Sequence, residues 1–302
     1  MSDGETINIC LSSDDNYAKH AGVVIASILY NANSDDNLII SILDGGISEK
    51  YKNEILSLKS IKNCEINFIK IDNAMFDIFK DIQTHAYISL PAYFRLKMPT
   101  FLPEAKKVIY LDCDVIVNTS LKELYETDID NYLLAGVLDS KRRMIKKNPT
   151  YINTGVLLIN IEKLREDNLE NKVLEYAKQN AKKIKFGDQE IINDVCKGKI
   201  KLIDKEWNVQ SSNFVNRSCY THNPKIIHFV SQRKPWHFGS FSYHKNFYFK
   251  YLQLTPWKLD EKEYKHWTKD NQIESIKQYL KHRPLFFIRP RFYKALFLTY
   301  FT

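Results

Sequence analysis

Apolar runs of two lengths alternate along the first third of the chain, and this alternation restricts the folds open to it. Longer patterns predict helices at 21–32 and 48–60, the second capped by Ser48. Short runs rich in Ile and Leu predict buried strands at 7–13, 38–44 and 65–71. Strands alternating with helices are joined by right-handed crossovers, which make them parallel and cover both faces of their sheet. The sequence therefore predicts an α/β fold around a mostly parallel sheet.

Glycine is scarce, at nine residues in 302, and neither G-x-G-x-x-G nor a Walker loop occurs, so a glycine-rich phosphate cradle is excluded. We expect a nucleotide-binding domain over residues 1–255 and a small, basic and aromatic, helical region over 256–302. Later apolar runs, in which a strand ends after VIYL (108–111) and further runs follow at 131–139 and 154–161, continue the pattern, and a helix is predicted from Glu162 to about Ala181.

Two carboxylates stand one residue apart in KKVIYLDCDVIV (106–117), where an apolar strand runs out. In a strand, Asp112 and Asp114 point to one face and Cys113 to the other. Two carboxylates this close together repel each other and are costly to bury, so a nearby group must offset their charge. A hard cation, Mg²⁺ or Mn²⁺, would offset it, and backbone donors at the strand end are the alternative. Asp14 and Asp15 also follow a predicted strand, at the sheet edge where ligands of open α/β sheets gather.

Most of the net charge of +8 comes from the C-terminal end of the chain. Residues 277–302 hold six of the 44 Lys and Arg residues and no acid, which leaves 38 basic against 36 acidic residues elsewhere. This distribution argues against a nucleic-acid partner. The same segment contains eight Phe and Tyr, a pattern suited to an anionic membrane surface. The alternative is a C-terminal helix whose aromatic side chains pack on the body of the protein.

No apolar stretch reaches the roughly 18 residues of a membrane span, and the first residues do not resemble a signal peptide. The five cysteines are widely spaced and form no Cys-x-x-Cys pattern, which predicts reduced thiols. We therefore expect a cytoplasmic protein, held peripherally at the inner face of the cytoplasmic membrane.

Six segments occur in an order and at spacings that match one known family. They are SSDDNY (12–17), PAYFRL (91–96), VIYLDCDVIV (108–117), YINTGVLLIN (151–160), FGDQEIIN (186–193) and IIHFVSQRKPW (226–236). Over residues 7 to 240 the chain resembles the bacterial retaining glycosyltransferases of family eight, which include lipooligosaccharide galactosyltransferases and, more distantly, glycogenin. The resemblance implies a GT-A-type fold and a UDP-hexose donor.

The resemblance implies a metal site and a phosphate contact. Asp112, Asp114 and His228 would bind manganese, with magnesium as the alternative ion. An imidazole beside two carboxylates favours Mn²⁺, because nitrogen ligands suit the softer ion. Lys234 matches the family lysine that contacts the diphosphate. Without the resemblance, His228 and Lys234 would be a structural histidine and a surface lysine.

Other matched residues are implied to hold the donor nucleotide. Asp14 and Asn16 occupy the positions that bind uracil and ribose, in a set with Ser12 and Cys113. The alternative for Asp14 and Asn16 is a turn that caps the following helix. Arg95 resembles the arginine near the donor sugar and phosphates, and the alternative is an arginine whose stem packs on a neighbouring ring.

The transferred sugar is implied to lie against Asn153, Asp188 and Gln189. Asp188 would accept hydrogen bonds from sugar hydroxyls, and Gln189 would lie near the anomeric carbon, away from the leaving group. Asp188 could also stand in the first turn of a helix for structural reasons. Because an amide replaces the carboxylate nucleophile that double displacement needs, we favour front-face transfer. Asp139 matches an acceptor-contact position and equally suits a strand end.

The predicted activity is transfer of galactose or glucose from a UDP-sugar to a glycan or glycolipid acceptor such as lipopolysaccharide or lipooligosaccharide. The alternative is a catalytically silent nucleotide- or carbohydrate-binding protein that retains the fold. Two departures affect substrate choice. Ser231 replaces a family glycine near the phosphates, and a short basic segment, SKRRMIKKNPT (140–150), stands where relatives carry a longer lid. Those charges favour an anionic acceptor or are simply solvated.

Overall fold

The computed structural model describes most of the chain up to residue 260. The described residues are 6–80, 82, 89–140, 144–145, 148–211, 223–230, 234–237, 240, 242, 244–260, 262–263, 274, 277, 280–281, 285, 288 and 293. Ser231, residues 141–143 and 146–147, and most of 277–302 lie outside them. The division at residue 255 and the role of the basic, aromatic segment remain predictions. Within the described part, no helix is both long enough and apolar enough to cross a bilayer.

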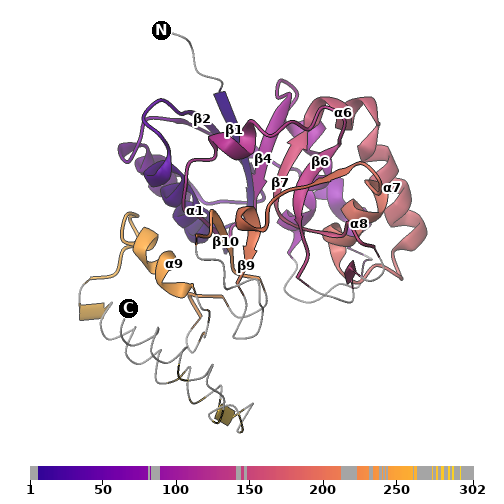
Figure 1. Cartoon of the computed structure of the whole chain (residues 1–302). Helices are drawn as coiled ribbons and strands as arrows, with labels where there is room; N and C mark the ends of the chain where they lie inside the picture. The colour runs from indigo at the N-terminus through magenta and orange to yellow at the C-terminus, as the bar shows by residue number, and fades with distance from the viewer. Residues whose placement is uncertain are drawn as a thin grey trace.

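A seven-stranded sheet forms the centre of the molecule (Figure 1). Its spatial order is β3-β2-β1-β4-β7-β6-β8, and only β7 runs antiparallel to both neighbours. The mostly parallel sheet is therefore confirmed. The strands are β1 (Thr6–Ser13), β2 (Asn37–Asp44), β3 (Glu65–Lys70), β4 (Lys107–Leu111), β6 (Leu134–Leu138), β7 (Ile152–Asn160) and β8 (Ile200–Leu202).

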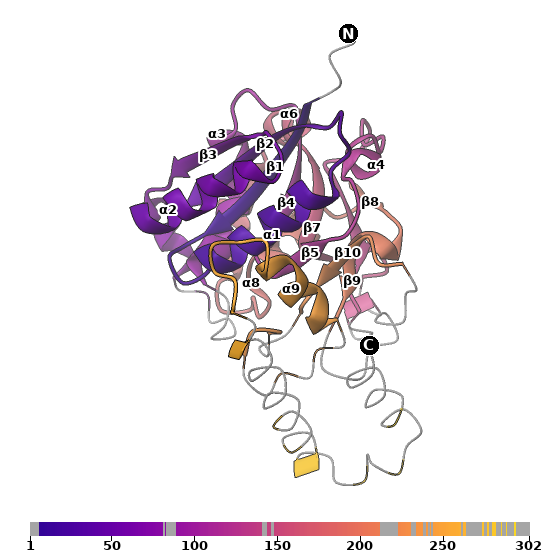
Figure 2. The same cartoon turned by 90° about the vertical axis from the view of Figure 1, so that its left-hand side faces the viewer.

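Strand β4 shows why the sheet is covered on both faces. Ile109 and Leu111 join the apolar cluster beneath α1 (Ala18–Asn31) and α2 (Glu49–Leu56). Val108 and Tyr110 alternate with them and join the cluster beneath α7 (Leu169–Asn180) and α8 (Gly187–Val195). A strand buried on both faces reads as a continuous apolar run, as this one does. Figure 2 shows α1 and α2 in front of the sheet.

A second sheet of three short strands lies beside the first, in the order β5-β10-β9. It contains β5 (Val115–Val117), β9 (Val209–Gln210) and β10 (Ile226–His228), and β10 pairs antiparallel with β5. Helix α9 (Lys245–Leu252) packs its aromatic side chains against this sheet and against Val23 of α1. The remaining short elements are α3 (Met98–Phe101), α4 (Lys122–Tyr125), α6 (Ile161–Glu166), η1 (Ser57–Ser60), η2 (Asn73–Phe79), η3 (Leu90–Lys97) and η4 (Lys205–Asn208).

Three local predictions differ from the structure. The segment 106–117 is two strands in two sheets, because the chain turns at Asp112 and Asp114 between β4 and β5. The helix predicted from Glu162 is broken into α6 and α7 at Asn168, which adopts a left-handed φ of 51° that asparagine tolerates. Ser48 stands at the start of α2 but its side chain makes no capping hydrogen bond. The four described cysteines are free thiols, as expected.

Candidate active site

The paired carboxylates and a distant histidine meet where β4 leaves the large sheet. Nε2 of His228 lies 3.2 Å from Asp114 Oδ1 and 3.8 Å from Asp112 Oδ2. Ligand atoms of all three side chains lie within 4.8 Å of one another. The turn thus keeps both carboxylates on one side, as the sequence predicted, although they are not in a strand. Cys113 is buried on the other side, and its Sγ donates to the Ser12 carbonyl oxygen at 3.1 Å.

Strand pairing explains why His228 reaches this turn from over a hundred residues away. The register of β10 on β5 places His228 opposite Val115, directly after the second carboxylate. The N–H of Phe229 then donates to the Asp114 carbonyl oxygen at 2.9 Å. On the other strand of the turn, the Asp112 N–H donates to the Gly155 carbonyl oxygen at 2.9 Å. Backbone hydrogen bonds therefore fix the spacing of the three side chains.

Gly155 of β7 makes room for the histidine. A β-carbon at this position would lie 2.1 Å from His228 Cε1 and 2.7 Å from Asp112 Oδ2. Both separations are far below van der Waals contact, so no larger residue fits while the imidazole stays in place. Nothing in the sequence indicated a role for this glycine, because the close approach arises only when β7 and β10 are brought together.

The three side chains fit a divalent cation. Asp114 Oδ1 is buried and has no hydrogen-bond donor among the residues that the structure describes. Two carboxylates and one imidazole are a donor set that suits Mn²⁺ better than Mg²⁺. Burial alone would raise the pKa of Asp114, but Lys234 and His228 together outweigh it and hold this pKa well below the usual range. Asp114 is therefore an anion over the physiological pH range.

Lys234 is buried beside the paired carboxylates and is not an ordinary surface lysine. Its side chain is 9% exposed, and its ammonium contacts Asp114 Oδ2 and donates to the Phe229 carbonyl oxygen at 2.8 Å. Trp236, two residues after Lys234, stacks on His20 of α1 with ring centroids 3.6 Å apart. This contact anchors the Lys234 segment to α1.

Arg95 of η3 joins the two acidic parts of the site. It donates to Asp112 Oδ1 at 2.6 Å, its Nε lies 3.2 Å from Asp188 Oδ2, and it donates to the Thr154 carbonyl oxygen at 2.6 Å. The guanidinium lies over the ring of Tyr110, 4.3 Å from its centroid. Burial would lower the pKa of Arg95, but the two carboxylates raise it above its usual value. The sequence indicated an arginine near the donor sugar and phosphates, but it did not indicate that Arg95 pairs with both Asp112 and Asp188.

The first turn of α8 supplies two further polar side chains. Gly187, with a φ of 58°, begins the helix and directs Asp188 and Gln189 into the site. Burial raises the pKa of Asp188 to about 6, despite the opposing charge of Arg95. Gln189 accepts from Asn153 Nδ2 at 3.1 Å and donates to Asp139 Oδ2 at 3.0 Å. Gln189, Asn153 and Asp139 therefore form one hydrogen-bonded group beside the cluster of Asp112, Asp114 and His228.

The end of β1 forms another part of the site edge. Asp14 is half-buried, and its carboxylate accepts from the Tyr17 N–H at 3.1 Å, so the turn predicted as its alternative role is present. Asn16 is exposed in the same turn. Asp15 accepts from the Ser48 N–H at 2.8 Å, which holds two loops together. One oxygen of Asp14 is thus engaged by the backbone, and the binding roles of Asp14, Asn16 and Ser12 remain predictions.

Comparison with known proteins assigns the family. The model of "Glycosyl transferase family 8" matches residues 8–239, which is most of the chain. The chain belongs to this family. A Haemophilus influenzae protein that carries a glycosyltransferase name is 34% identical over 247 residues, covering 77% of this chain and 74% of that protein. An Escherichia coli lipopolysaccharide 1,2-glucosyltransferase is 26% identical, covering 85% and 81%.

A solved structure confirms the fold of this family 8 member. The crystal structure of the galactosyltransferase LgtC in complex with donor and acceptor sugar analogs superposes with a TM-score of 0.73. The two chains are 25% identical, and the match covers 85% of this chain and 98% of LgtC. The predicted GT-A-type fold and the family resemblance are therefore confirmed.

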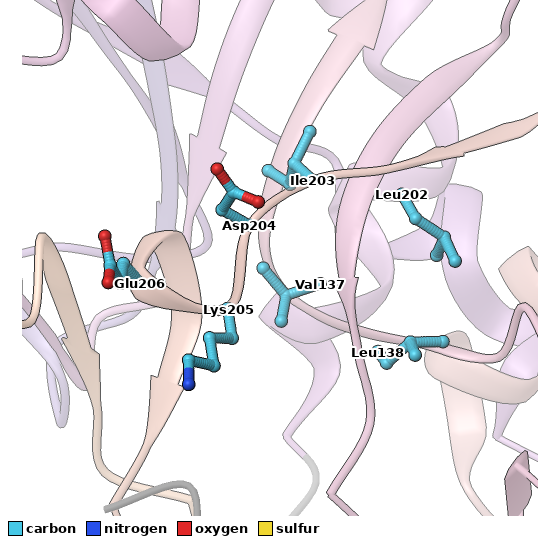
Figure 3. A pocket seen from close by; sticks show the side chains of 7 residues that line it. All are labelled: Val137, Leu138, Leu202, Ile203, Asp204, Lys205 and Glu206. Carbon is cyan, nitrogen blue, oxygen red and sulfur yellow. The ribbon is translucent and has the colours of Figure 1, made fainter. Parts of the chain in front are cut away.

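A separate pocket of about 510 Å³ lies outside this family 8 site (Figure 3). Leu138, at the end of β6, lines the pocket, whereas the adjacent Asp139 contacts Gln189 in the site. The pocket is lined by Val137, Leu138, Leu202, Ile203, Asp204, Lys205 and Glu206, none of which the sequence analysis singled out.

Proposed function

We propose that the chain is a metal-dependent retaining glycosyltransferase that moves galactose or glucose from a UDP-sugar to a glycan acceptor. The observation that carries this proposal is the cluster of Asp112, Asp114 and His228 beside the buried Lys234. Such a cluster can take a cation and a diphosphate together. Two relatives support the substrate classes, since one is named a lipopolysaccharide glucosyltransferase and the other was solved with donor and acceptor sugar analogs.

Each part of the site has a role in this proposal. Asp112, Asp114 and His228 would hold the metal, which supplies positive charge where negative charge grows on the departing diphosphate. Lys234 would donate to the same phosphates. Asp14, Asn16 and Ser12 would hold the uridine at the end of β1. These contacts act on developing charge, so they accelerate bond cleavage in addition to binding the donor.

The sugar would lie between Arg95 and the first turn of α8. Asp188 is buried and paired with Arg95, and it would accept from sugar hydroxyls. Gln189 presents an amide, which is too weak a nucleophile for double displacement. We therefore favour front-face transfer, in which the acceptor hydroxyl attacks beside the leaving phosphate and a phosphate oxygen takes its proton.

The test is a screen of UDP-glucose, UDP-galactose and their N-acetyl forms for UDP release with Mn²⁺, with Mg²⁺ and with a chelator. We expect Mn²⁺-dependent release from one hexose donor, and loss of that release in Asp114→Ala. Tight UDP binding without release from any donor, with or without candidate acceptors, would instead indicate a silent binding protein. A covalent sugar trapped on Asp188 would overturn front-face transfer.

We also propose that residues 277–302 attach the enzyme peripherally to the inner face of the cytoplasmic membrane, where glycolipid acceptors are built. Three apolar side chains within this segment, Leu285, Ile288 and Tyr293, are 72%, 64% and 58% exposed. Basic residues with exposed aromatic and aliphatic groups bind anionic lipid. Replacing the six Lys and Arg residues there with Gln should abolish sedimentation with phosphatidylglycerol vesicles and leave hydrolysis intact. Unchanged sedimentation would refute the attachment.

A further inference from the structure

A continuous row of hydrogen bonds joins the histidine of the metal cluster to the amide beside the sugar position. His228 Nδ1 lies 3.1 Å from Asn208 Oδ1, and Asn208 Nδ2 donates to Asn153 Oδ1 at 2.9 Å. Asn153 Nδ2 donates to Gln189 Oε1 at 3.1 Å, and Gln189 Nε2 donates to Asp139 Oδ2 at 3.0 Å. Asn208, the second member, is 1% exposed and matches none of the predicted site residues.

Two backbone donors fix the direction of this row. The Gly155 N–H donates to Asn153 Oδ1 at 3.1 Å, and the Thr154 N–H donates to Gln189 Oε1 at 3.4 Å. A backbone N–H can only donate, so the atoms facing it must be the amide oxygens. The NH₂ groups of Asn153 and Gln189 therefore point away from β7, and neither amide can be reversed without losing a backbone hydrogen bond.

The tautomer of a neutral His228 follows from that direction. Since Asn153 presents its oxygen, Asn208 must present its NH₂ to it and turn its own oxygen toward His228. A neutral imidazole facing an oxygen at Nδ1 carries its proton there. Nε2 is then left with a free lone pair, and this is the atom that lies 3.2 Å from Asp114 Oδ1. The row thus prepares the tautomer that can bind a metal.

We propose that Asn208 is a positioning residue that sets the His228 tautomer for the metal and, through Asn153, orients the Gln189 amide. The inference rests on the proposed function and deepens it, because it couples the metal site to the sugar site by one buried side chain. Asn208 is suited to this task by its place at the end of η4, where the chain enters β9 and β9 pairs with β10. Outer partners of metal-bound histidines typically change metal affinity or activity about 10–100-fold when removed.

Two substitutions separate the two effects. In Asn208→Asp, a carboxylate oxygen still accepts from His228 Nδ1–H, but the other oxygen faces the Asn153 oxygen and breaks the row there. In Asn208→Leu, a side chain of similar size loses both hydrogen bonds. The matched control is Asn31→Leu, which removes an amide that donates to the Ser27 and Val117 carbonyl oxygens, away from the site.

The first measurement is the tautomer itself, which needs neither metal nor substrate. Long-range ¹H–¹⁵N spectra of the metal-free protein, recorded at a pH where the imidazole is neutral, should show His228 protonated at Nδ1, with its signals assigned by their loss in His228→Gln. Asn208→Asp and Asn31→Leu should retain this pattern, and Asn208→Leu should shift His228 toward the Nε2–H form. An unchanged tautomer in Asn208→Leu would refute the inference, even if the enzyme proves inactive.

The second measurement is Mn²⁺ affinity by calorimetry with UDP present, followed by the rate of donor hydrolysis. Asn208→Leu should weaken Mn²⁺ binding about 10–100-fold, whereas Asn208→Asp should keep it within about threefold and lose about 10–100-fold in kcat. Equal losses of affinity in both variants would mean that Asn208 only supports the fold. If the wild-type protein binds no Mn²⁺, the proposed function fails, and the tautomer result still decides the role of Asn208.

Discussion

Replacing Gly155 with alanine should remove a metal ligand without removing any polar atom. The new β-carbon would lie 2.1 Å from His228 Cε1, whereas ordinary contacts begin at 3.4 Å, so one partner must move by about 1.3 Å. The β7 backbone is held by its pairing with β4 and by the Asp112 N–H, so the imidazole is the group that moves. Metal–ligand distances tolerate only about 0.2 Å.

Gly155→Ala should lower both the stability of the protein and its affinity for Mn²⁺, by different amounts. Overpacking of this kind costs about 1–3 kcal/mol of stability, which corresponds to a fall of several degrees in Tm. The loss of metal affinity should be larger than that for an outer partner, at least about 100-fold. Calorimetry of Mn²⁺ binding with UDP, together with thermal unfolding followed by circular dichroism, measures both.

Gly136→Ala provides the matched control. Its β-carbon would meet Ile152 Cδ1 at 2.7 Å and Leu157 Cδ2 at 3.2 Å, in the apolar core beneath the same sheet. We expect a similar loss of stability with unchanged Mn²⁺ affinity. If Gly155→Ala binds Mn²⁺ as tightly as the wild type while folding normally, the placement of His228 against β7 is wrong.

Three further predictions concern the charges of the site. Arg95→Leu leaves Asp112 and Asp188 unpaired and should destabilise the metal-free protein by about 3–5 kcal/mol in urea unfolding, an effect that Mn²⁺ partly reverses. In the folded protein the pKa of Asp188 is raised from 3.8 to about 6, so its contribution to the free energy of unfolding is favourable below pH 4 and is lost as pH rises to 6. Asp188→Asn should reduce this pH-dependent fall in the free energy of unfolding by roughly 3 kcal/mol. An equal pH dependence of unfolding in the variant and the wild type would contradict this prediction. Lys234→Met removes the ammonium at Asp114, so Mn²⁺ should raise the Tm of this variant more than that of the wild type.

Regular elements could be predicted from the sequence because their information is local. The apolar runs at 7–13 and 38–44 became β1 and β2 almost residue for residue, since strands buried on both faces have few alternatives. The break at Asn168 was missed, because one residue with a left-handed φ does not disturb the apolar period around it. The end of β4 before Asp112 was expected, but the start of β5 in a second sheet was not, because the runs on both sides of the turn are equally apolar.

The site could be predicted only where a motif or the family resemblance named a residue. Asp112, Asp114 and His228 were named from motif and resemblance, and the structure brings them together. Asn208 and Gly155 carry no such signal. Their importance comes from contacts between segments distant in sequence, namely Asn208 with His228 and Asn153, and Gly155 with the same imidazole.

The most direct test of the account is the position of manganese in crystals grown with MnCl₂ and UDP. Anomalous scattering should reveal one Mn²⁺ bound by Asp112, Asp114 and His228 Nε2 and by oxygens of the diphosphate, with Lys234 turned toward the same phosphates. Bound UDP with no manganese at these three side chains, or manganese and nucleotide at another place on the protein, would contradict it.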